Sequence, residues 1–204
     1  MDKRLSLTQM DLLKEIGTIG AGRAATAMAD LLSAKVDISV PQTSLVPLEN
    51  ITNLLGGSEQ VVFVLDMGLG GDAACRIFLL FSPEDAKTLS SILLNKTPEE
   101  IDFNDELFQS SLKECANILS GSFVSALAEL TNMSIISTVP SLAMDMVGAI
   151  LDFIFIQIAQ YSEEAFFIKT DLAVSNLKLN GLMMFFPHSE SLRKIFEALG
   201  LKEE

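Results

Sequence analysis

The chain contains one internal repeat, and this duplication constrains its fold more than any other feature of the sequence. The segment Asp11–Pro41 aligns without gaps with Ser110–Pro140, at an offset of 99 residues, and 10 of the 31 aligned positions are identical. Chance alone would give about two identities over that length. We therefore predict a fold made of two similar halves that are related by a pseudo-twofold axis.

The first half continues with a strand pair and a short helix. Val61–Leu65 and Arg76–Phe81 are apolar, strand-like runs on either side of a predicted glycine-rich turn at Gly68–Gly71. Ser82 and Pro83 follow, and a serine before a proline is typical of a helix start. The first half therefore predicts a long helix, strands and a short helix, in that order.

The second half repeats this order after a polar linker at Thr97–Asn104. Phe166–Val174 and Leu179–Phe186 predict the strand pair, and Ser189–Leu199 predicts the short helix. The predicted fold class is α+β, with one antiparallel sheet that carries two long, related helices. We predict a single domain over residues 1–204, made of two repeats at about residues 8–96 and 104–200.

The two long helices have recognisable starts and faces. Thr8-x-x-Asp11 resembles a capping box and predicts a start near Gln9, whereas Asn104 and Asp105 predict the start of the second helix. Polar residues of the second helix lie at i, i+4 and i+7, on one face: Ser110, Glu114 and Asn117. An apolar stripe is expected on the opposite face, at Leu112, Cys115, Leu119, Ala126, Leu127 and Leu130.

Charge and cysteine content argue against several classes of function. The chain has 27 acidic and 14 basic residues and a net charge of −13, so nucleic acid and anionic lipid surfaces are disfavoured partners. Cys75 and Cys115 have no metal-ligand spacing. The most apolar run, Met146–Tyr161, contains Asp152 and is too short to span a bilayer. With no secretion signal visible, we expect a cytoplasmic protein without membrane insertion.

Three polar residues on one helix face would by themselves fit the solvated side of any amphipathic helix. Their spacing, however, matches a known signature. Ser110-x-x-x-Glu114-x-x-Asn117, followed 22 residues later by Pro140, resembles the signature of the CheC/CheX/FliY chemotaxis phosphatases. In CheC and FliY proteins that signature occurs once per half, so the duplication favours them over CheX-like proteins. FliY proteins would carry an extra C-terminal domain after the two repeats, and because the sequence runs only to Glu204 we expect CheC to be the closer resemblance.

The resemblance implies an activity and a role for each residue of the second copy. The substrate would be the aspartyl phosphate of a CheY-type response regulator. Glu114 and Asn117 would be catalytic, with Asn117 holding the attacking water and Glu114 pairing with a lysine of the partner. The protein would need no cofactor or metal of its own, because Mg²⁺ is expected on the phosphorylated partner.

The first copy departs from the signature at one position. Asp11, Glu15 and Pro41 keep the register, but Thr18 stands where the family has asparagine. Threonine is shorter and branched, and it has no amide to hold a water. We therefore expect a degenerate second site at Glu15 and Thr18, and we expect Ser110, Pro140, Asp11 and Pro41 to support the two motifs.

A second partner and a second class of function remain open. Asp145 begins the apolar segment Met144–Tyr161, and the corresponding region of CheC proteins resembles a docking surface for the deamidase CheD. The alternative for this segment is a buried element capped by an acid. For the whole chain, the alternative to a phosphatase is a non-enzymatic adaptor that docks CheD or the flagellar switch.

Overall fold

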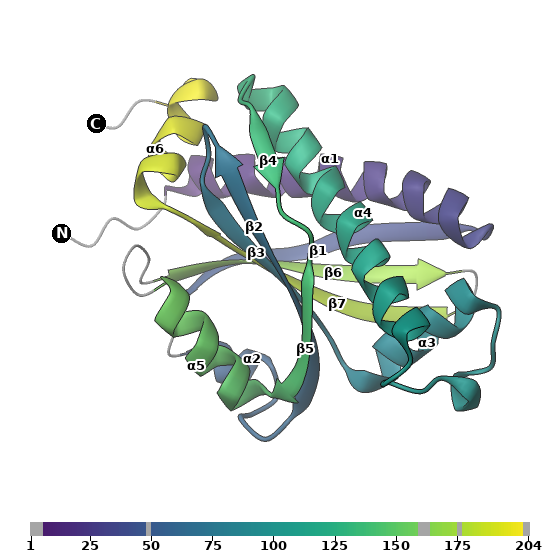
Figure 1. Ribbon diagram of the computed structural model, residues 1–204. Coiled ribbons are helices and arrows are strands. Elements are labelled where there is room, and N and C mark those ends of the chain that lie inside the picture. The colour runs from purple at the N-terminus through teal and green to yellow at the C-terminus, as the bar shows by residue number, and fades with distance from the viewer. Residues whose placement is uncertain (1–5, 48–49, 159–163, 175–176, 202–204) are drawn as a thin grey trace.

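Two long helices cross over one face of an antiparallel sheet (Figure 1). The structure is a computed structural model and describes residues 6–47, 50–158, 164–174 and 177–201. The helices, α1 (Leu7–Leu32) and α4 (Glu106–Thr131), have 26 residues each, and both arise from the aligned segments. The predicted fold class, α+β with two related long helices on an antiparallel sheet, is confirmed.

The sheet has seven strands, all paired antiparallel in the order β1-β6-β7-β3-β2-β4, and β5 pairs with β2 next to β4. The strands are β1 (Val36–Pro47), β2 (Val61–Gly71), β3 (Cys75–Phe81), β4 (Ile135–Ser137), β5 (Ser141–Met146), β6 (Glu164–Val174) and β7 (Leu177–Pro187). The shorter helices are α2 (Ile51–Leu54), α3 (Pro83–Leu94), the 3₁₀ turn η2 (Pro98–Glu100), α5 (Val147–Ile158) and α6 (Ser189–Ala198).

Each half gives a strand to the other half. β1 leaves the first half to pair with β6, and β5 leaves the second half to pair with β2. β3 and β7 pair with each other at the centre of the sheet, so the strand order is nearly symmetrical about that pair. Because the strands of the halves are interleaved, neither half has a complete sheet of its own.

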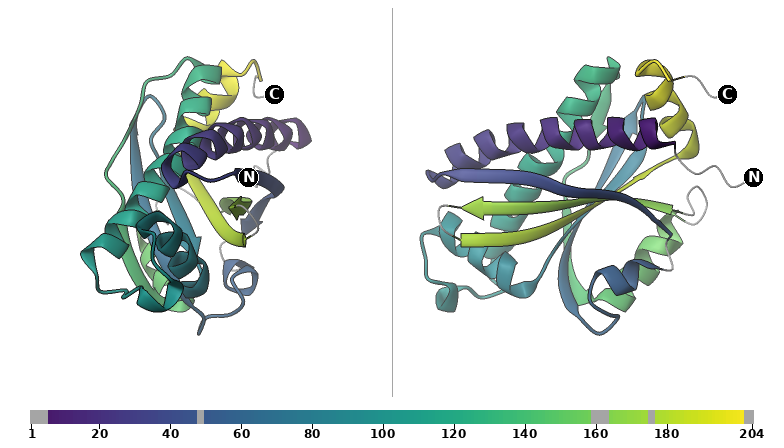
Figure 2. Two further views of the ribbon diagram at one scale, coloured as in Figure 1. Left: turned by 90° about the vertical axis from the view of Figure 1, so that its right-hand side faces the viewer. Right: turned by 180° about the vertical axis from the view of Figure 1, so that it is seen from behind.

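Side chains of the sheet alternate between two hydrophobic cores, one on each face. In β3, Ile77 and Leu79 point into the core beneath α1, α3, α4 and α6, whereas Phe78 and Leu80 point into a second core beneath α2 and α5. Figure 2 shows α1 and the pair α2–α5 on opposite sides of the strands. Helices therefore cover both faces of the sheet, whereas the sequence predicted helices on one sheet without indicating a second covered face.

The crossing of α1 and α4 depends on a glycine. A Cβ atom added to Gly20 would lie 2.9 Å from the Cα of Phe123, which is closer than such atoms approach in proteins. Arg23 and Glu129 join the same two helices by an exposed ion pair. The backbones of α1 and α4 therefore touch through Gly20, and this contact fixes how the two motif-bearing helices lie relative to each other.

The predicted start of the first helix and the predicted glycine-rich turn were both wrong. The helix α1 begins two residues earlier than expected, because Ser6 and Gln9 form the capping box: the Gln9 amide donates to Ser6 Oγ (3.2 Å), and the Ser6 amide donates to Gln9 Oε1 (2.7 Å). Glutamine at the third helical position reaches back to the cap, whereas the aspartate expected there is one carbon shorter.

Gly68–Gly71 belongs to strand β2 rather than to a turn. At Gly71 φ is +87°, and an added Cβ would lie 2.2 Å from the carbonyl oxygen of Ser134. The Asp72 amide donates to that same carbonyl (2.9 Å). The glycines therefore let the chain before β4 approach the backbone of β2.

The remaining predicted elements are confirmed. Ser82 caps α3 with its side chain and Pro83 occupies the first turn, as expected. Asp105 caps α4, and its carboxylate accepts the amide of Leu107 (2.9 Å). The strands β6 and β7 and the helix α6 cover the predicted ranges in the second half.

Candidate functional site

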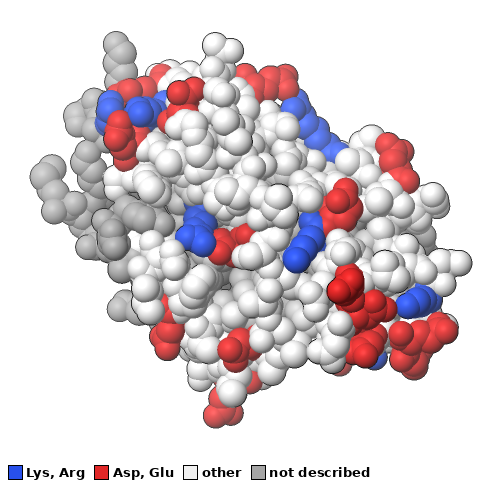
Figure 3. Space-filling model, in the orientation of Figure 1, with Lys and Arg blue, Asp and Glu red and all other residues white. Residues whose placement is uncertain are grey.

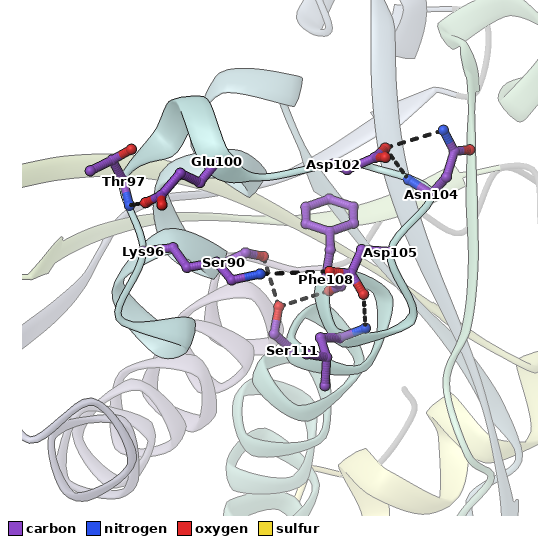
Figure 4. A network of polar contacts seen from close by, with 10 residues as sticks. Ser90, Lys96, Thr97, Glu100, Asp102, Asn104, Asp105, Phe108 and Ser111 are labelled. Carbon is purple, nitrogen blue, oxygen red and sulfur yellow. Dashed lines mark hydrogen bonds and ion pairs between the residues drawn. The ribbon is translucent and has the colours of Figure 1, made fainter.

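The start of α4 is held firmly against the preceding segment (Figure 4). Ser111 Oγ donates to the backbone carbonyl of Phe108 (2.7 Å) and lies 2.8 Å from Ser90 Oγ on α3, and all three residues are buried. Lys96 forms an ion pair with the capping residue Asp105 (3.7 Å). These contacts fix the first two turns of α4 and with them the direction of its exposed face.

That exposed face carries the three polar residues of the second motif. Ser110, Glu114 and Asn117 are all exposed. Within the described part of the chain, no hydrogen bond or ion pair engages the side chains of Glu114 and Asn117. A carboxylate and a carboxamide are therefore presented to solvent about one helical turn apart.

The opposite face of α4 forms the core, with one exception to the prediction. Leu112, Cys115, Ala126 and Leu127 are buried, and Leu119 is half-buried. Leu130 was expected in the same stripe, but 42% of its surface is exposed. Leu130 lies in the last turn of α4, one residue before the helix ends at Thr131, where its side chain is only partly covered.

Pro140 takes no part in the exposed face. It is buried and directly precedes β5, at the edge of the sheet. Nearby, Thr138 Oγ1 accepts the amide of Gly68 (3.0 Å), which ties the segment after β4 to β2. The proline of the motif therefore belongs to the structural frame of the site and is not one of the side chains that the exposed face presents.

In the first copy, Asp11, Glu15 and Thr18 are likewise exposed along α1. Thr18 Oγ1 donates to the Lys14 carbonyl of its own helix (2.9 Å). The proton of this hydroxyl is therefore used within α1, as is common for threonine in a helix. Pro41 lies in β1, and its side chain falls outside the described part of the structure.

Charge around the site is uneven. Figure 3 shows acidic side chains gathered at the lower right, around the start of α4. The exposed acids of that region are Glu99, Glu100, Asp102 and Glu106. Hydrogen bonds from Thr97, chiefly its backbone amide, lower the pKa of Glu100. At neutral pH this end of the exposed face is therefore strongly negative.

Asp145 lies on the other face of the sheet from α1 and α4. Its partner across the β5–β2 ladder is Val62, which points into the core beneath α2 and α5, and paired residues share a face. The Asp145 carboxylate accepts the amide of Met146 (2.7 Å) and borders a cavity of about 270 Å³ between β5, β2 and α5.

The apolar segment that follows Asp145 is partly buried and partly exposed. In α5, Val147, Ile150, Leu151, Ile154 and Ile158 fill the second core. The side chains of Phe153 and Ile156, in contrast, are 48% and 73% exposed. The part of the predicted segment at residues 159–161 lies outside the described residues.

One polar cluster was not found by sequence reasoning. Arg76 on β3 donates two hydrogen bonds to the carboxylate of Asp66 on β2 (2.7 and 2.6 Å) and a third to Gln157 on α5 (3.0 Å). The only signal would have been two opposite charges in otherwise apolar strands. The cluster joins α5 to the sheet.

The structure places the two thiols in the core. Burial raises the pKa of Cys75 and Cys115 to about 12, so neither thiol ionises near neutral pH. Among residues 6–47, 50–158, 164–174 and 177–201, no group of three or more His, Cys, Asp or Glu side chains lies close enough to hold a metal ion. Over the same ranges, every helix is too short or too polar to cross a membrane.

Comparison with known proteins gives concordant results. The CheC-like family matches at residues 9–45 and 109–144, which are the two repeated segments. The CheY-P phosphatase CheC of Bacillus subtilis is 32% identical over 196 residues, covering 94% of each chain. The crystal structure of FliY from Thermotoga maritima superimposes with a TM-score of 0.79 at 19% identity, covering 98% of this chain and 99% of that one.

A second solved structure has the same fold in a complex. It is the CheX–CheY–BeF₃–Mg²⁺ complex from Borrelia burgdorferi, which matches with a TM-score of 0.51 at 18% identity and covers 86% of this chain and 97% of that one. At such identities both structural likenesses establish the fold.

Proposed function

Because this chain belongs to the CheC-like family, we propose that it hydrolyses the aspartyl phosphate of a phosphorylated CheY-type response regulator. The observation that carries the proposal is the exposed pair Glu114 and Asn117, whose side chains have no hydrogen-bond or ion-pair partner among the described residues. The similarity to a CheY-P phosphatase over nearly the whole chain supports the same reaction.

The chemistry requires little from this protein. An aspartyl phosphate is an activated acyl phosphate, and the response regulator holds its own Mg²⁺ and lysine beside it. The complex that contains CheX, CheY, BeF₃ and Mg²⁺ supports placing the metal on the partner side. What remains is to hold a water in line with phosphorus, and phosphoryl transfer depends mainly on such positioning.

Asn117 supplies that positioning in our proposal. Its carboxamide has one acceptor and two donors, so it can accept a hydrogen bond from the water while donating to a phosphoryl oxygen. Glu114 lies one turn earlier and pairs with the lysine of the partner, which sets the register of the two proteins. Ser110 and the buried Pro140 support this face without touching the reacting atoms.

The first copy contributes less. Glu15 and Thr18 form a degenerate site, because the Thr18 hydroxyl donates to the Lys14 carbonyl and has no amide to hold the water. Asp11 and Pro41 complete the motif around it. The protein therefore works chiefly through its second site.

We also propose that residues 1–204 form a single domain of two repeats, at about residues 8–96 and 104–200. The exchange of β1 and β5 between the halves supports this, because separating the repeats would leave each half of the sheet without one of its strands. We place the protein in the cytoplasm, where response regulators of chemotaxis act.

A second docking function, for a CheD-type deamidase, is supported by the surface around Asp145. Besides this carboxylate, the surface exposes Phe153 and Ile156 of α5, whereas Met144 and Met146 point to the other face of β5. It lies on the face of the sheet opposite to α4, so such a partner would leave the phosphatase face free. If hydrolysis were absent, this docking would be the main function, and the protein would act as an adaptor.

The test of the main proposal is a phosphate-release assay. A CheY-type regulator is phosphorylated with a small phosphodonor, and release of inorganic phosphate is followed with and without this protein. We expect acceleration that depends on protein concentration and that Asn117→Ala removes. If inorganic phosphate is released at the same rate with and without the wild-type protein, hydrolysis is refuted and the adaptor function is the remaining alternative.

A further inference from the structure

Gly121 is a glycine in the middle of α4 that no contact with the described residues explains. A Cβ atom added there would meet no heavy atom of these residues within 4 Å outside its own helix backbone. Gly20 is the opposite case, since its Cβ would collide with the backbone of Phe123. Glycine in a helix interior is less stable than alanine, so the stability of the fold alone would favour a side chain at position 121.

The position of Gly121 relates it to the site. It follows Asn117 by four residues, so the two lie on the same face in adjacent turns. Side chains of a helix lean toward its N-terminus and cover the surface of the preceding turn. Any side chain at position 121 would therefore extend toward the carboxamide of Asn117.

We infer that Gly121 is a clearance position, whose missing side chain lets the phosphorylated regulator approach α4 closely enough for Asn117 to reach the attacking water. This inference rests on the proposed function. Reacting atoms must come within about 3–3.5 Å, so one or a few carbon atoms between the two proteins would hold the phosphoryl group out of reach. Gly121 acts through the approach of the partner and does not touch the reacting atoms.

The repeat supplies a matched control on the same molecule. Gly22 occupies the equivalent position of α1, four residues after Thr18, and an added Cβ there also meets nothing within 4 Å. Both glycines lie in the interior of a 26-residue helix. A substitution should therefore change helix stability similarly at either position, whereas only position 121 neighbours an asparagine.

The experiment compares Gly121→Ala and Gly121→Leu with Gly22→Ala and Gly22→Leu. Both alanine variants should raise Tm by about 2–4 °C, because alanine favours the helix. In phosphate release, kcat/KM should fall about tenfold for Gly121→Ala and about 10²-fold for Gly121→Leu, whereas the Gly22 variants should match the wild type. Affinity for the regulator loaded with beryllium trifluoride and Mg²⁺ should weaken in the order Gly, Ala, Leu at position 121.

The outcomes separate this inference from the proposed function. Full activity and full affinity in Gly121→Leu, with Tm at least that of the wild type, would overturn the clearance role alone. An equal loss in the Gly22 and Gly121 variants would overturn it as well, because the effect would then not follow Asn117. A wild-type protein that neither releases phosphate nor binds the loaded regulator would overturn the proposed function, and the inference with it.

Discussion

Gly20 on α1 lies against Phe123 on α4, so closely that a Cβ atom at position 20 would be 2.9 Å from the Phe123 Cα. The atom that it would meet belongs to the backbone and cannot move away by changing a rotamer. The contact is the point at which the helices of the two repeats touch. It therefore sets the distance between the helices that carry both motifs.

This contact predicts a loss of stability in Gly20→Ala. Overpacking costs about 1–3 kcal/mol and the better helix propensity of alanine returns about 1 kcal/mol, so we expect a net loss of up to about 2 kcal/mol. Urea unfolding would measure it. Gly22→Ala, two residues away and open to solvent, is the control and should gain stability; a gain in Gly20→Ala as well would contradict the close packing.

Substitutions on the exposed face of α4 should lower the rate of phosphate release and leave the stability nearly unchanged. Asn117→Ala should lower the rate of phosphate release by about 10²–10³-fold, as loss of one positioned polar group often does. Its free energy of unfolding should change by no more than about 0.5 kcal/mol, because the residue is exposed. Glu114→Ala should weaken binding of the regulator in addition to slowing release. Normal release by a folded Asn117→Ala protein would refute the assigned mechanism.

The first copy predicts a gain of function. Thr18→Asn restores the missing amide and removes only the local hydrogen bond to the Lys14 carbonyl, and the two residues have similar helix propensities. Phosphate release is measured in Thr18→Asn combined with Asn117→Ala, where only the first site can act. We expect activity above that of Asn117→Ala alone.

Arg23 decides how the result on α1 is interpreted. Its cation is paired with Glu129 across the helix crossing, where the second copy has Ser122 in the equivalent position. Adding Arg23→Ser to the double variant removes any repulsion of the partner's lysine, at little cost because exposed ion pairs stabilise weakly. If neither the double nor the triple variant releases phosphate while both are folded, α1 lacks more than one amide.

The surface of β5 and α5 predicts a charge-dependent partner. Asp145→Lys should abolish binding to a CheD-type deamidase, because it replaces a carboxylate that borders the same cavity as Phe153 with a cation. Titration calorimetry measures the affinity, and thermal unfolding checks the fold. Glu84→Lys, an equal charge change at an exposed position of α3, is the control. Unchanged affinity in Asp145→Lys would assign this carboxylate to the scaffold alone.

The local elements and the candidate site residues could be predicted from the amino-acid sequence. Helix and strand periodicity, the cap at Ser82 and the repeat depend on residues close together in the chain, so they are visible without a structure. The same holds for the exposure of Glu114 and Asn117, since positions three residues apart share a helix face and the apolar stripe of α4 lies on the opposite face.

The way in which the two repeats combine depends on long-range contacts. The exchange of β1 and β5 depends on pairings between residues at least 75 positions apart, and the second core beneath α5 depends on the same exchange, which no local pattern encodes. The same is true of the two helix glycines, which look alike in sequence. Gly20 meets the backbone of Phe123 and Gly121 meets nothing, because packing density at a position is set by whatever the fold brings next to it.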